Sequence, residues 1–244
     1  MHSFFTTVFY EPLYNGLVWF ISIIPYHNVG LAVIFFTVII KIILFPLSQK
    51  SVRTQFEMKK LEPELNEIKL KYKDDSALQA EKIMGIYKER NINPFAGIFL
   101  MLIQLPVLMA LYYVFLKGGL PNLDSSSLYP FTKIPEYISM DFFGADVAKK
   151  NLYIAIFAAL AQYLQIHFTL PKTQKNKETS NTFNDQLARS MNMQMKYVMP
   201  VFIFFIAKSF PAVVALYLIT SCFFAIGQEL YMRKKYGINL PKDK

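Results

Sequence analysis

Residues 93–116, NPFAGIFLMLIQLPVLMALYYVFL, decide the fold of this chain. The hydrocarbon core of a bilayer is about 30 Å thick, and roughly 20 apolar residues of helix are needed to cross it. Residues 94–116 have that length and carry no charge, with Asn93 at a helix N-cap position and Pro94 at the first helical position. The stretch is therefore predicted to be a membrane-spanning helix.

The composition of the whole chain agrees with a membrane protein. Of its 244 residues, 54% are hydrophobic and 18% are charged, which excludes disorder, collagen and most soluble enzymes. The net charge of +9 fits binding to nucleic acid, binding to anionic lipid, or membrane topology alone. The positions of the charges have to decide between these.

Four more apolar stretches accompany the first, and the chain is predicted to have five spans. At ~1.5 Å per residue the fourth is only about 24 Å long, which favours local thinning of the bilayer. A corner at Phe210 and Pro211 separates the last two, so they are predicted to form a tight helical hairpin. The predicted class is an all-α polytopic membrane protein with five transmembrane helices, at residues 29–47, 94–116, 152–170, 194–209 and 211–231.

The segment before the first span is apolar and aromatic but interrupted. Glu11, Pro12, Asn15 and Gly16 break it, and it lacks the basic start of a cleaved signal peptide. We expect residues 1–28 to form an extracytoplasmic interfacial helix that leads into the first span. The alternative, in which the second half of the segment spans the membrane, would change the topology parity.

The basic residues set the predicted orientation, because cytoplasmic segments of membrane proteins carry the excess of Lys and Arg. Residues 48–93 contain ten, residues 171–196 five and the tail from residue 232 another five, against none in 1–28 and four in 117–150. The N-terminus is thus predicted outside and the C-terminus in the cytoplasm. Residues 117–151 become an extracytoplasmic loop, 171–193 a cytoplasmic loop and 232–244 a basic cytoplasmic tail. Topology explains most of the net charge, so recognition of a specific nucleic-acid sequence is not expected.

Residues 48–93 are predicted to form a cytoplasmic helical hairpin. Apolar residues from Met58 to Tyr72 recur every three or four positions, as in a coiled-coil seam. Asp74 and Asp75 mark a turn, and Ser76 with Gln79 reads as a capping box that starts the second helix. Pro63 should kink the first helix or mark its true start.

The hairpin has two possible roles. It is either a solvated connector between two spans or a mobile arm that contacts incoming chains, a ribosome or lipid headgroups. On the second interpretation the contact residues are those of the two apolar stripes: Met58, Leu61, Leu65, Tyr72, Met84 and Tyr87.

Lys41 is the most informative residue in the chain, because a basic side chain within a span is costly and usually functional. It lies six residues before Leu47, about 9 Å from the cytoplasmic end at ~1.5 Å per residue. One interpretation is that its side chain snorkels to the cytoplasmic interface. The other is that it charges a hydrated cavity open to the cytoplasm.

Other polar residues within the spans favour the cavity. Any one of these residues, and also His167, could simply hydrogen-bond to a neighbouring helix. Lys208 is expected to snorkel outward. Together with Lys41 they predict a positively charged hydrophilic groove for substrate, lined by Lys41, Thr37, Gln104, Gln162, Gln165 and Tyr217.

Metal and cofactor chemistry has little support in the sequence. Cys222 is the single cysteine, which rules out an intramolecular disulfide or a Cys-based zinc site. His2, His27 and His167 lack metal-ligand spacing, and neither a Gly-rich phosphate loop nor a pair of intramembrane carboxylates is found. We therefore expect no cofactor, no metal and no enzymatic activity. An intramembrane enzyme is the least favoured class, because Cys222 has no clear histidine partner.

Four motifs resemble the YidC/Oxa/Alb family of membrane protein insertases. They are TVIIKIILFPLSQK (37–50), KKLEPELNEIKLKY (59–72), YKERNINPFAGIFLMLIQLPVLMALYYVF (87–115) and MPVFIFFIAKSFPAVVALY (199–217). The resemblance covers residues 10–233, and the block at 93–113 is the most specific. It implies five core spans, a cytoplasmic hairpin and a groove closed toward the outside. At the position where the family usually has a groove arginine this chain has Lys41, which keeps the charge but not the planar, two-pronged donor.

The resemblance implies an insertase and chaperone. A nascent membrane protein would be attracted from the cytoplasm into the groove by Lys41, and its apolar segment would then partition into lipid without nucleotide. Implied partners are nascent membrane proteins and the lipid bilayer, with the ribosome and a Sec-type translocon as further candidates, in a bacterial plasma membrane. The alternatives are a small anion transporter or channel, and an assembly scaffold that translocates nothing.

Overall fold

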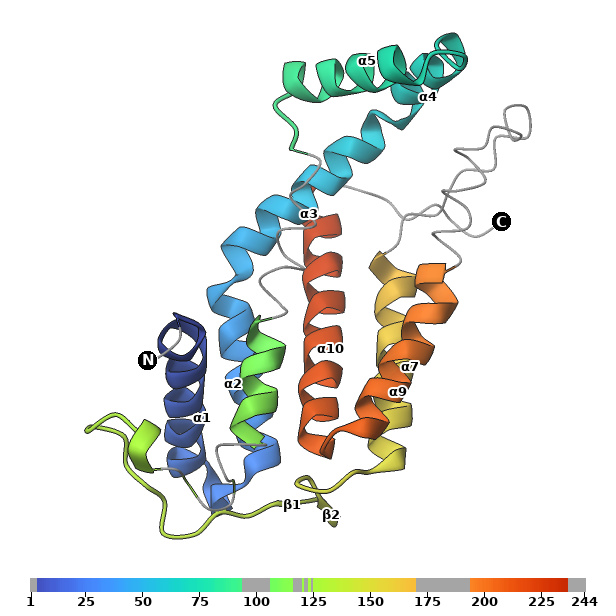
Figure 1. Cartoon of the computed structure of the whole chain (residues 1–244). Helices are drawn as coiled ribbons and strands as arrows, with labels where there is room; N and C mark the ends of the chain where they lie inside the picture. The colour runs from blue at the N-terminus through green and yellow to red at the C-terminus, as the bar shows by residue number, and fades with distance from the viewer. Residues whose placement is uncertain are drawn as a thin grey trace. The chain divides into compact units, whose positions relative to one another are not determined.

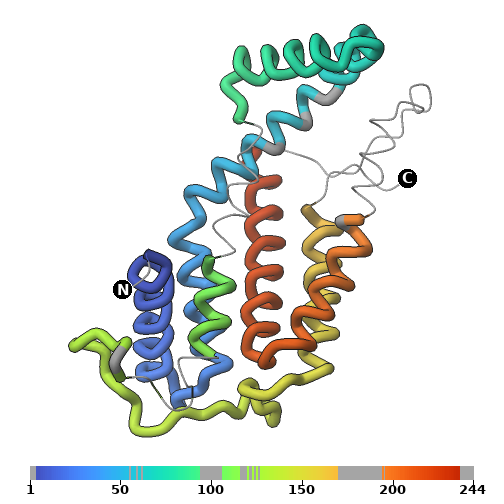
Figure 2. The backbone as a smooth tube through the Cα atoms, viewed as in Figure 1, coloured from blue at the N-terminus to red at the C-terminus, as the bar shows by residue number. Residues whose placement is uncertain are grey.

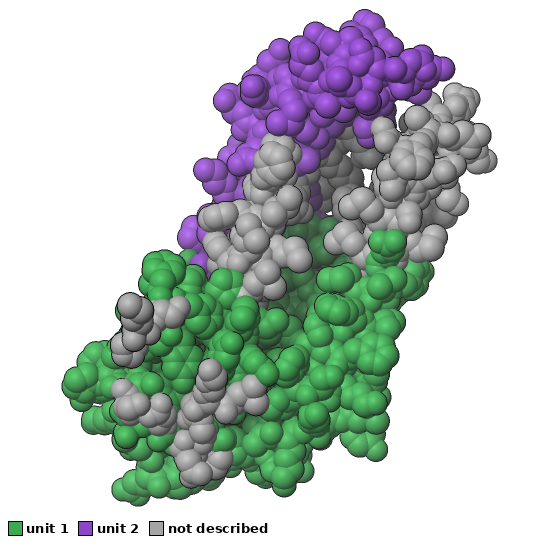
Figure 3. All heavy atoms as spheres, in the orientation of Figure 1, with its two compact units in different colours: residues 1–43, 105–229 green, residues 44–104, 230–244 purple. Residues whose placement is uncertain are grey.

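The computed structural model describes residues 4–93, 106–115, 120, 123, 125–169 and 194–236. The chain divides into two compact units (Figure 3). Unit 1 comprises residues 1–43 and 105–229, and unit 2 comprises residues 44–104 and 230–244. The predicted cytoplasmic loop at 171–193 and the first half of the span predicted at 94–116, including Gln104, lie outside the described residues.

The first half of unit 1 is a helical hairpin. A π-helical turn, η1 (Thr6–Tyr10), continues into α1 (Glu11–Ile23). The 3-10 turn η2 (Pro25–His27) then reverses the chain into α2 (Val29–Ile43), which packs beside α1 (Figures 1 and 2). The apolar helix Pro106–Phe115 contributes further residues to the same core.

The second half of unit 1 contains three more helices. After a 3-10 turn, η3 (Ser125–Ser127), and an extended loop, α7 (Leu152–Thr169) packs closely against α9 (Met199–Ser209). The π-helical turn η4 (Gln194–Val198) leads into α9. The last helix, α10 (Ala212–Lys235), starts in unit 1 and ends in unit 2.

The predicted all-α membrane class is confirmed at this coarse level. Among the described residues, α7 and α10 are long and apolar enough to cross a membrane. Residues 29–43 and 45–58 pass the same test together as one broken span, and Pro106–Phe115 is apolar but shorter. The five-span arrangement remains a prediction.

Two predicted spans differ in detail from the observed helices, and proline explains both differences. The stretch predicted at 29–47 ends as α2 at Ile43, and α3 (Phe45–Lys60) begins after Leu44. Pro46 lacks the N–H that an unbroken helix would use at that point. The stretch predicted at 194–209 starts as a π-helical turn and becomes α-helical only at Met199, one residue before Pro200.

Asparagine side chains cap the first turns of α2 and α7 in unit 1. The Asn28 Oδ1 accepts a hydrogen bond from the Leu31 N–H (3.0 Å) at the start of α2. The Asn151 Oδ1 accepts from the N–H groups of Tyr153 (3.0 Å) and Ile154 (3.2 Å) at the start of α7. These bonds satisfy N–H groups that have no partner within their own helix.

One end of unit 1 is closed by backbone hydrogen bonds. The N–H of Val29 donates to the Ser139 carbonyl (3.0 Å), and the N–H of Ala212 donates to the Lys149 carbonyl (2.9 Å). Between these contacts, β1 (Asp141–Phe142) pairs antiparallel with β2 (Ala145–Asp146). We call this end, made of residues 25–28, 139–150 and 210–211, the loop end. The opposite end, made of residues 38–43, 159–169 and 218–229, is called the lysine end.

The loop from residue 125 to 132 is attached to α1 through Asn15, which is 4% exposed. Its amide nitrogen donates to the carbonyls of Glu11 (2.8 Å) and Ser127 (2.9 Å). Its amide oxygen accepts from the Tyr129 N–H (2.6 Å) and the Thr132 hydroxyl (2.9 Å). Every hydrogen-bonding position of the Asn15 amide is therefore used by protein groups.

The core of unit 1 joins α1, α2, Pro106–Phe115 and the start of α10. Buried residues of this core include Leu17, Val33, Leu111 and Val213. The segment predicted as an interfacial helix supplies several of its fully buried side chains: Tyr14, Leu17, Val18 and Ile21. Alpha-helix α1 is thus a packed member of unit 1, and its placement at the membrane interface remains a prediction.

Unit 2 contains the predicted hairpin. After α3, α4 (Glu62–Lys71) begins with Pro63 in its first turn, which confirms that this proline marks a helix start. Helix α5 (Ser76–Glu89) is capped by Asp75, whose carboxylate accepts from the N–H groups of Ala77 and Leu78. The predicted capping box at Ser76 and Gln79 is wrong, because the Asp75 side chain already takes those donors and Gln79 donates to the Lys69 carbonyl (3.0 Å).

Candidate functional site

The predicted groove residues of α2 lie one helical turn apart on the same side of the helix. Thr37 is buried, and its hydroxyl donates to the Val33 carbonyl of its own helix (2.6 Å). Lys41, the thirteenth residue of α2, is half-buried. The ammonium is therefore neither fully solvated nor fully enclosed by protein.

Helix α10 contributes three polar side chains of this site. Tyr217 is 1% exposed, and Ser221 follows it by one turn. The Tyr217 and Ser221 hydroxyls are close enough to interact with each other, but neither makes a well-formed hydrogen bond with any other described residue. A buried hydroxyl without a well-formed hydrogen bond is unfavourable. These two groups are consequently available to water or to a bound polar chain.

Cys222 and Gln162 link the helices at this level. The Cys222 thiol donates to the Gln162 Oε1 of α7 (3.3 Å), and Lys41 of α2 is close enough to Cys222 to interact with it electrostatically. Three helices thus meet at one polar cluster, defined here as Lys41, Gln162, Tyr217, Ser221 and Cys222.

The depth of the polar cluster follows from the helix starts. Helices α2, α7 and α10 all begin at the loop end, and Lys41, Gln162 and Cys222 are residues 13, 11 and 11 of their helices. At ~1.5 Å per residue, they lie roughly 15–18 Å from that end. This is about half the thickness of a hydrocarbon core.

Packing changes along the helices at this level. Residues 212–217 of α10 are all buried, whereas in residues 218–229 only Cys222 and Glu229 are. In α2 the buried residues stop at Thr37, and none of residues 38–43 is buried. The loop end is thus tightly packed, and the lysine end is more open around the polar cluster.

The other predicted site residues are not linked to the cluster by the contacts described above, or lie outside the described residues. Gln165 is half-buried, and its carbonyl accepts from the Thr169 hydroxyl (2.8 Å). His167 is exposed and stacks on Tyr163, with ring centroids 6.4 Å apart. Gln104 is not among the described residues, so the structure does not place it.

The predicted contact residues of the hairpin divide into two groups. Met58, Leu61, Leu65 and Tyr87 pack against one another and against Ile86 inside the hairpin, where partial burial raises the Tyr87 pKa. Tyr72 is half-buried next to the Lys71 ammonium, and Met84 is 40% exposed. Of the six residues, Met84 is thus the one with the most surface left for a partner.

Sequence reasoning missed Ser221 and Cys222 as parts of the cluster. Cys222 was considered as a disulfide, zinc-binding or nucleophilic residue, whereas in the structure its thiol donates to a glutamine. The sequence could have indicated Ser221, because it follows Tyr217 by four residues and therefore lies on the same side of the helix. In the described part of the chain, no three His, Cys, Asp or Glu residues could together hold a metal ion.

Comparison with known proteins identifies similar chains. Residues 19–239 match the family model described as 60Kd inner membrane protein. A protein of Clostridium tetani named membrane protein insertase YidC is 32% identical over 91% of this chain and 94% of its own length. A protein of the same name from Fusobacterium nucleatum is 33% identical over 85% of this chain and 87% of its own. A third, from Oceanobacillus iheyensis, is 27% identical over 93% and 83%.

Proposed function

The chain belongs to the 60Kd inner membrane protein family, and from this membership we propose that it is a membrane protein insertase, as its YidC relatives are named. It is an integral membrane protein, since the family match is joined by helices apolar and long enough to span a bilayer. Its substrates are nascent membrane proteins, and the lipid bilayer receives their apolar segments.

The observation that carries the mechanism is the polar cluster above the packed loop end. A cation at mid-membrane depth attracts the acidic or polar end of an incoming segment. The tight packing of residues 212–217 blocks passage beyond it on the protein side. The polar segment therefore has only part of the membrane left to cross, while the adjoining apolar segment moves into lipid.

The groove in this proposal is lined by Lys41, Thr37, Gln104, Gln162, Gln165 and Tyr217, with Ser221 and Cys222 added from the structure. It opens to the cytoplasm in a five-span arrangement with the N-terminus outside and the C-terminus inside a bacterial plasma membrane. The segment formed by η4 and α9, residues 194–209, measures about 24 Å at ~1.5 Å per residue. Such a helix supports local thinning of the bilayer.

The hairpin of unit 2 serves in this proposal as a cytoplasmic arm. The exposed side chains of Met84 and Leu70 give it an apolar surface for a nascent chain, and methionine adapts to varied partners. The ribosome and a Sec-type translocon are further proposed partners. Deleting α4 and α5 should then lower insertion without unfolding unit 1.

The test uses liposomes that contain only the purified protein and a small, newly translated membrane protein as substrate. Protease-protected substrate measures insertion. Loss of an attraction of about 1 kcal/mol in a wet site is roughly fivefold in an equilibrium constant, so Lys41→Ala should lower the protected fraction about fivefold. Lys41→Arg should retain most of it, because the charge is kept.

The matched control is Lys208→Ala, which removes a lysine near the end of a different predicted span. Lys208 is exposed near the end of α9, so its removal should change insertion little. Equal protection with and without the protein would contradict insertase activity. Insertion that survives Lys41→Ala undiminished would leave the insertase but exclude the electrostatic groove, and anion flux in the same liposomes would instead support a channel.

A further inference from the structure

Two exposed aromatic residues at the loop end have unusual backbone conformations. Tyr26 has a φ of +61° and is 78% exposed, and Phe143 has a φ of +52° and is 92% exposed. In this region the Cβ of an L residue crowds the following carbonyl oxygen, so bulky residues rarely occupy it. Neither side chain is compensated by burial within the chain.

Phe143 occupies the turn of a two-residue β-hairpin. The register pairs Phe142 with Ala145, which leaves Phe143 and Gly144 as the turn residues, both with positive φ. Turns of this kind strongly prefer Asn-Gly or Asp-Gly. A phenylalanine at the first position is both strained and, in water, an exposed apolar ring, whereas in lipid its exposure would be favourable.

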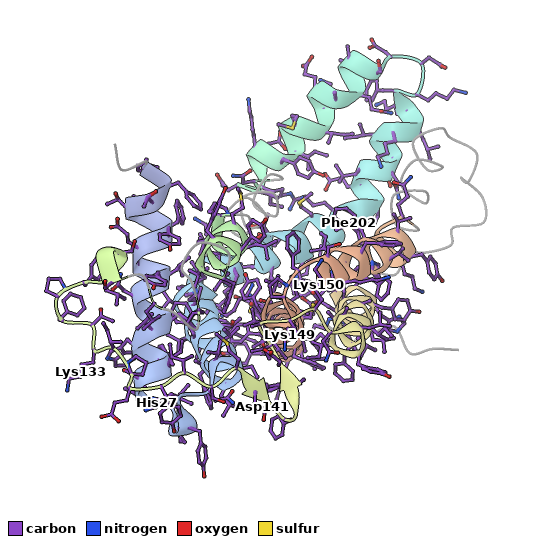
Figure 4. All side chains as sticks on the ribbon, turned by 60° about the horizontal axis from the view of Figure 1, so that its bottom comes forward. His27, Lys133, Asp141, Lys149, Lys150 and Phe202 are labelled. Carbon is purple, nitrogen blue, oxygen red and sulfur yellow. The ribbon has the colours of Figure 1, made fainter. Side chains whose placement is uncertain are left out.

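The hairpin is fixed at the ends of helices that can span a membrane. Backbone bonds connect Lys149 to Ala212 at the start of α10, and α7 begins at Leu152. On the other side of the hairpin, the amide nitrogen of Asn28 donates to the Asp141 carbonyl. Figure 4 shows His27, Asp141 and Lys149 together at this end of unit 1. The tip of the hairpin is thus held close to the level at which α7 and α10 enter the bilayer.

The exposed surface of α7 continues toward the hairpin as an apolar stripe. Tyr153, in the first turn, is 82% exposed, and it is followed at helical spacing by further exposed apolar side chains: Ile156, Phe157, Leu160 and Leu164. On a helix long and apolar enough to span, such a stripe faces lipid. The aromatic residues at the loop end therefore border a lipid-facing surface.

We propose that Phe143 and Tyr26 insert into the interfacial layer of the leaflet at the loop end and, with Tyr153, form an aromatic anchor for the hairpin. Aromatic side chains concentrate at membrane interfaces. The exposed Lys150 beside the hairpin suits lipid phosphates. The partner is the lipid of the surrounding bilayer, and in the proposed orientation this is its outer leaflet.

Fluorescence quenching tests the proposal in the full-length protein. Trp19 is the single tryptophan, so Trp19→Phe with Phe143→Trp gives one reporter at the tip. In vesicles of phosphatidylcholine with brominated chains, this reporter should be quenched by the lipid and its emission should be blue-shifted. A matched reporter, Trp19→Phe with Glu136→Trp, sits at an exposed charged position of the same loop and should be quenched by aqueous iodide instead. A tip reporter that behaves like the Glu136 reporter overturns the proposal.

The sign of a stability change gives a second test, one independent of insertase activity. Asn fits the positive φ of the turn better than Phe, so Phe143→Asn should raise the unfolding temperature if the ring lies in water. If the ring lies in lipid, the same substitution should lower the unfolding temperature of the protein in bilayer nanodiscs, because the interfacial contact is lost. A rise in nanodiscs would overturn the proposal even if the protein inserts its substrates normally.

Discussion

Two regions of unit 1, the Asn15 network on α1 and the polar cluster at the lysine end, treat their polar groups in opposite ways. The Asn15 amide is buried and all its hydrogen bonds go to protein groups. At the polar cluster, the hydroxyls of Tyr217 and Ser221 interact only with each other among the described residues, without a well-formed hydrogen bond. A hydrogen-bond network in which every polar group has a partner makes a region rigid. Polar groups without a full set of partners can instead bind water or a polar chain. The Asn15 network is therefore interpreted as structural, and the polar cluster as the surface available to a substrate.

Two helical glycines of the molecule also differ in their surroundings. A Cβ at Gly30, near the start of α2, would lie 2.6 Å from the Cγ of Phe142, far inside van der Waals contact. A Cβ at Gly227, in α10 at the lysine end, would meet nothing within 4 Å. The backbone of α2 at Gly30 is therefore closely approached by a side chain, whereas α10 at Gly227 tolerates added volume.

Breaking the Asn15 network should produce the largest effect on stability. Asn15→Leu leaves the Tyr129 N–H, the Thr132 hydroxyl and the Ser127 carbonyl without their partner, and each buried unpaired group costs on the order of 1–3 kcal/mol. We expect a loss of about 3 kcal/mol in the free energy of unfolding, measured by denaturation in detergent. Ser22→Ala, on the same helix, removes only a bond to the Trp19 carbonyl and should cost less than about 0.5 kcal/mol. Equal effects of the two would mean that other contacts hold the loop.

Alanine substitution at the two glycines should give opposite signs. Gly30→Ala should destabilise the protein by about 2 kcal/mol through overpacking against Phe142. Gly227→Ala should stabilise it by roughly 0.5–1 kcal/mol, since alanine is the better helix former and has space. Thermal unfolding of both variants measures the difference. The double variant Gly30→Ala with Phe142→Ala should be less destabilised than the sum of its single changes, and strict additivity would exclude the clash.

Removing the hydrogen bond at the lysine end should have the smallest effect. Gln162→Leu deletes the acceptor of the Cys222 thiol, and interhelical polar contacts in membranes contribute about 0.6 kcal/mol on average. The free energy of unfolding should therefore change by less than about 1 kcal/mol. The neighbouring Ala161 is 2% exposed, so Ala161→Leu should cost more, about 1–3 kcal/mol by overpacking. A larger loss from Gln162→Leu would show that the polar cluster is structural.

Features with a local cause could be predicted from the sequence. Pro63 marks the start of α4 because proline fits only the first turn of a helix. The cap of α5 was placed one residue too late, because Ser76 and Asp75 are both good caps and only geometry selects Asp75. The break at Leu44 was missed because residues 29–47 were predicted as one continuous span, whereas Pro46 lies in the first turn of a new helix.

Features that depend on distant partners could not be predicted. Lys41 and Gln162 were recognised by their cost within a span, but their link through Cys222 depends on the register of three helices. Asn15 was interpreted as an interruption of an apolar segment. Its partners, Ser127 and Thr132, lie 112 and 117 residues further along the chain, and no periodicity reports a contact of that separation.

That separation also sets an order of events during synthesis. When α1 and α2 have left the ribosome, the Asn15 amide has only the Glu11 carbonyl of its own helix, since residues 127–132 are not yet made. The N–H of Val29 likewise waits for Ser139, and the Lys149 carbonyl waits for Ala212 until the last helix emerges. The loop end is thus assembled late, after most of the apolar helices have been synthesised. An insertase must therefore itself pass through a folding intermediate in which its helices are present but its loop end has not yet formed.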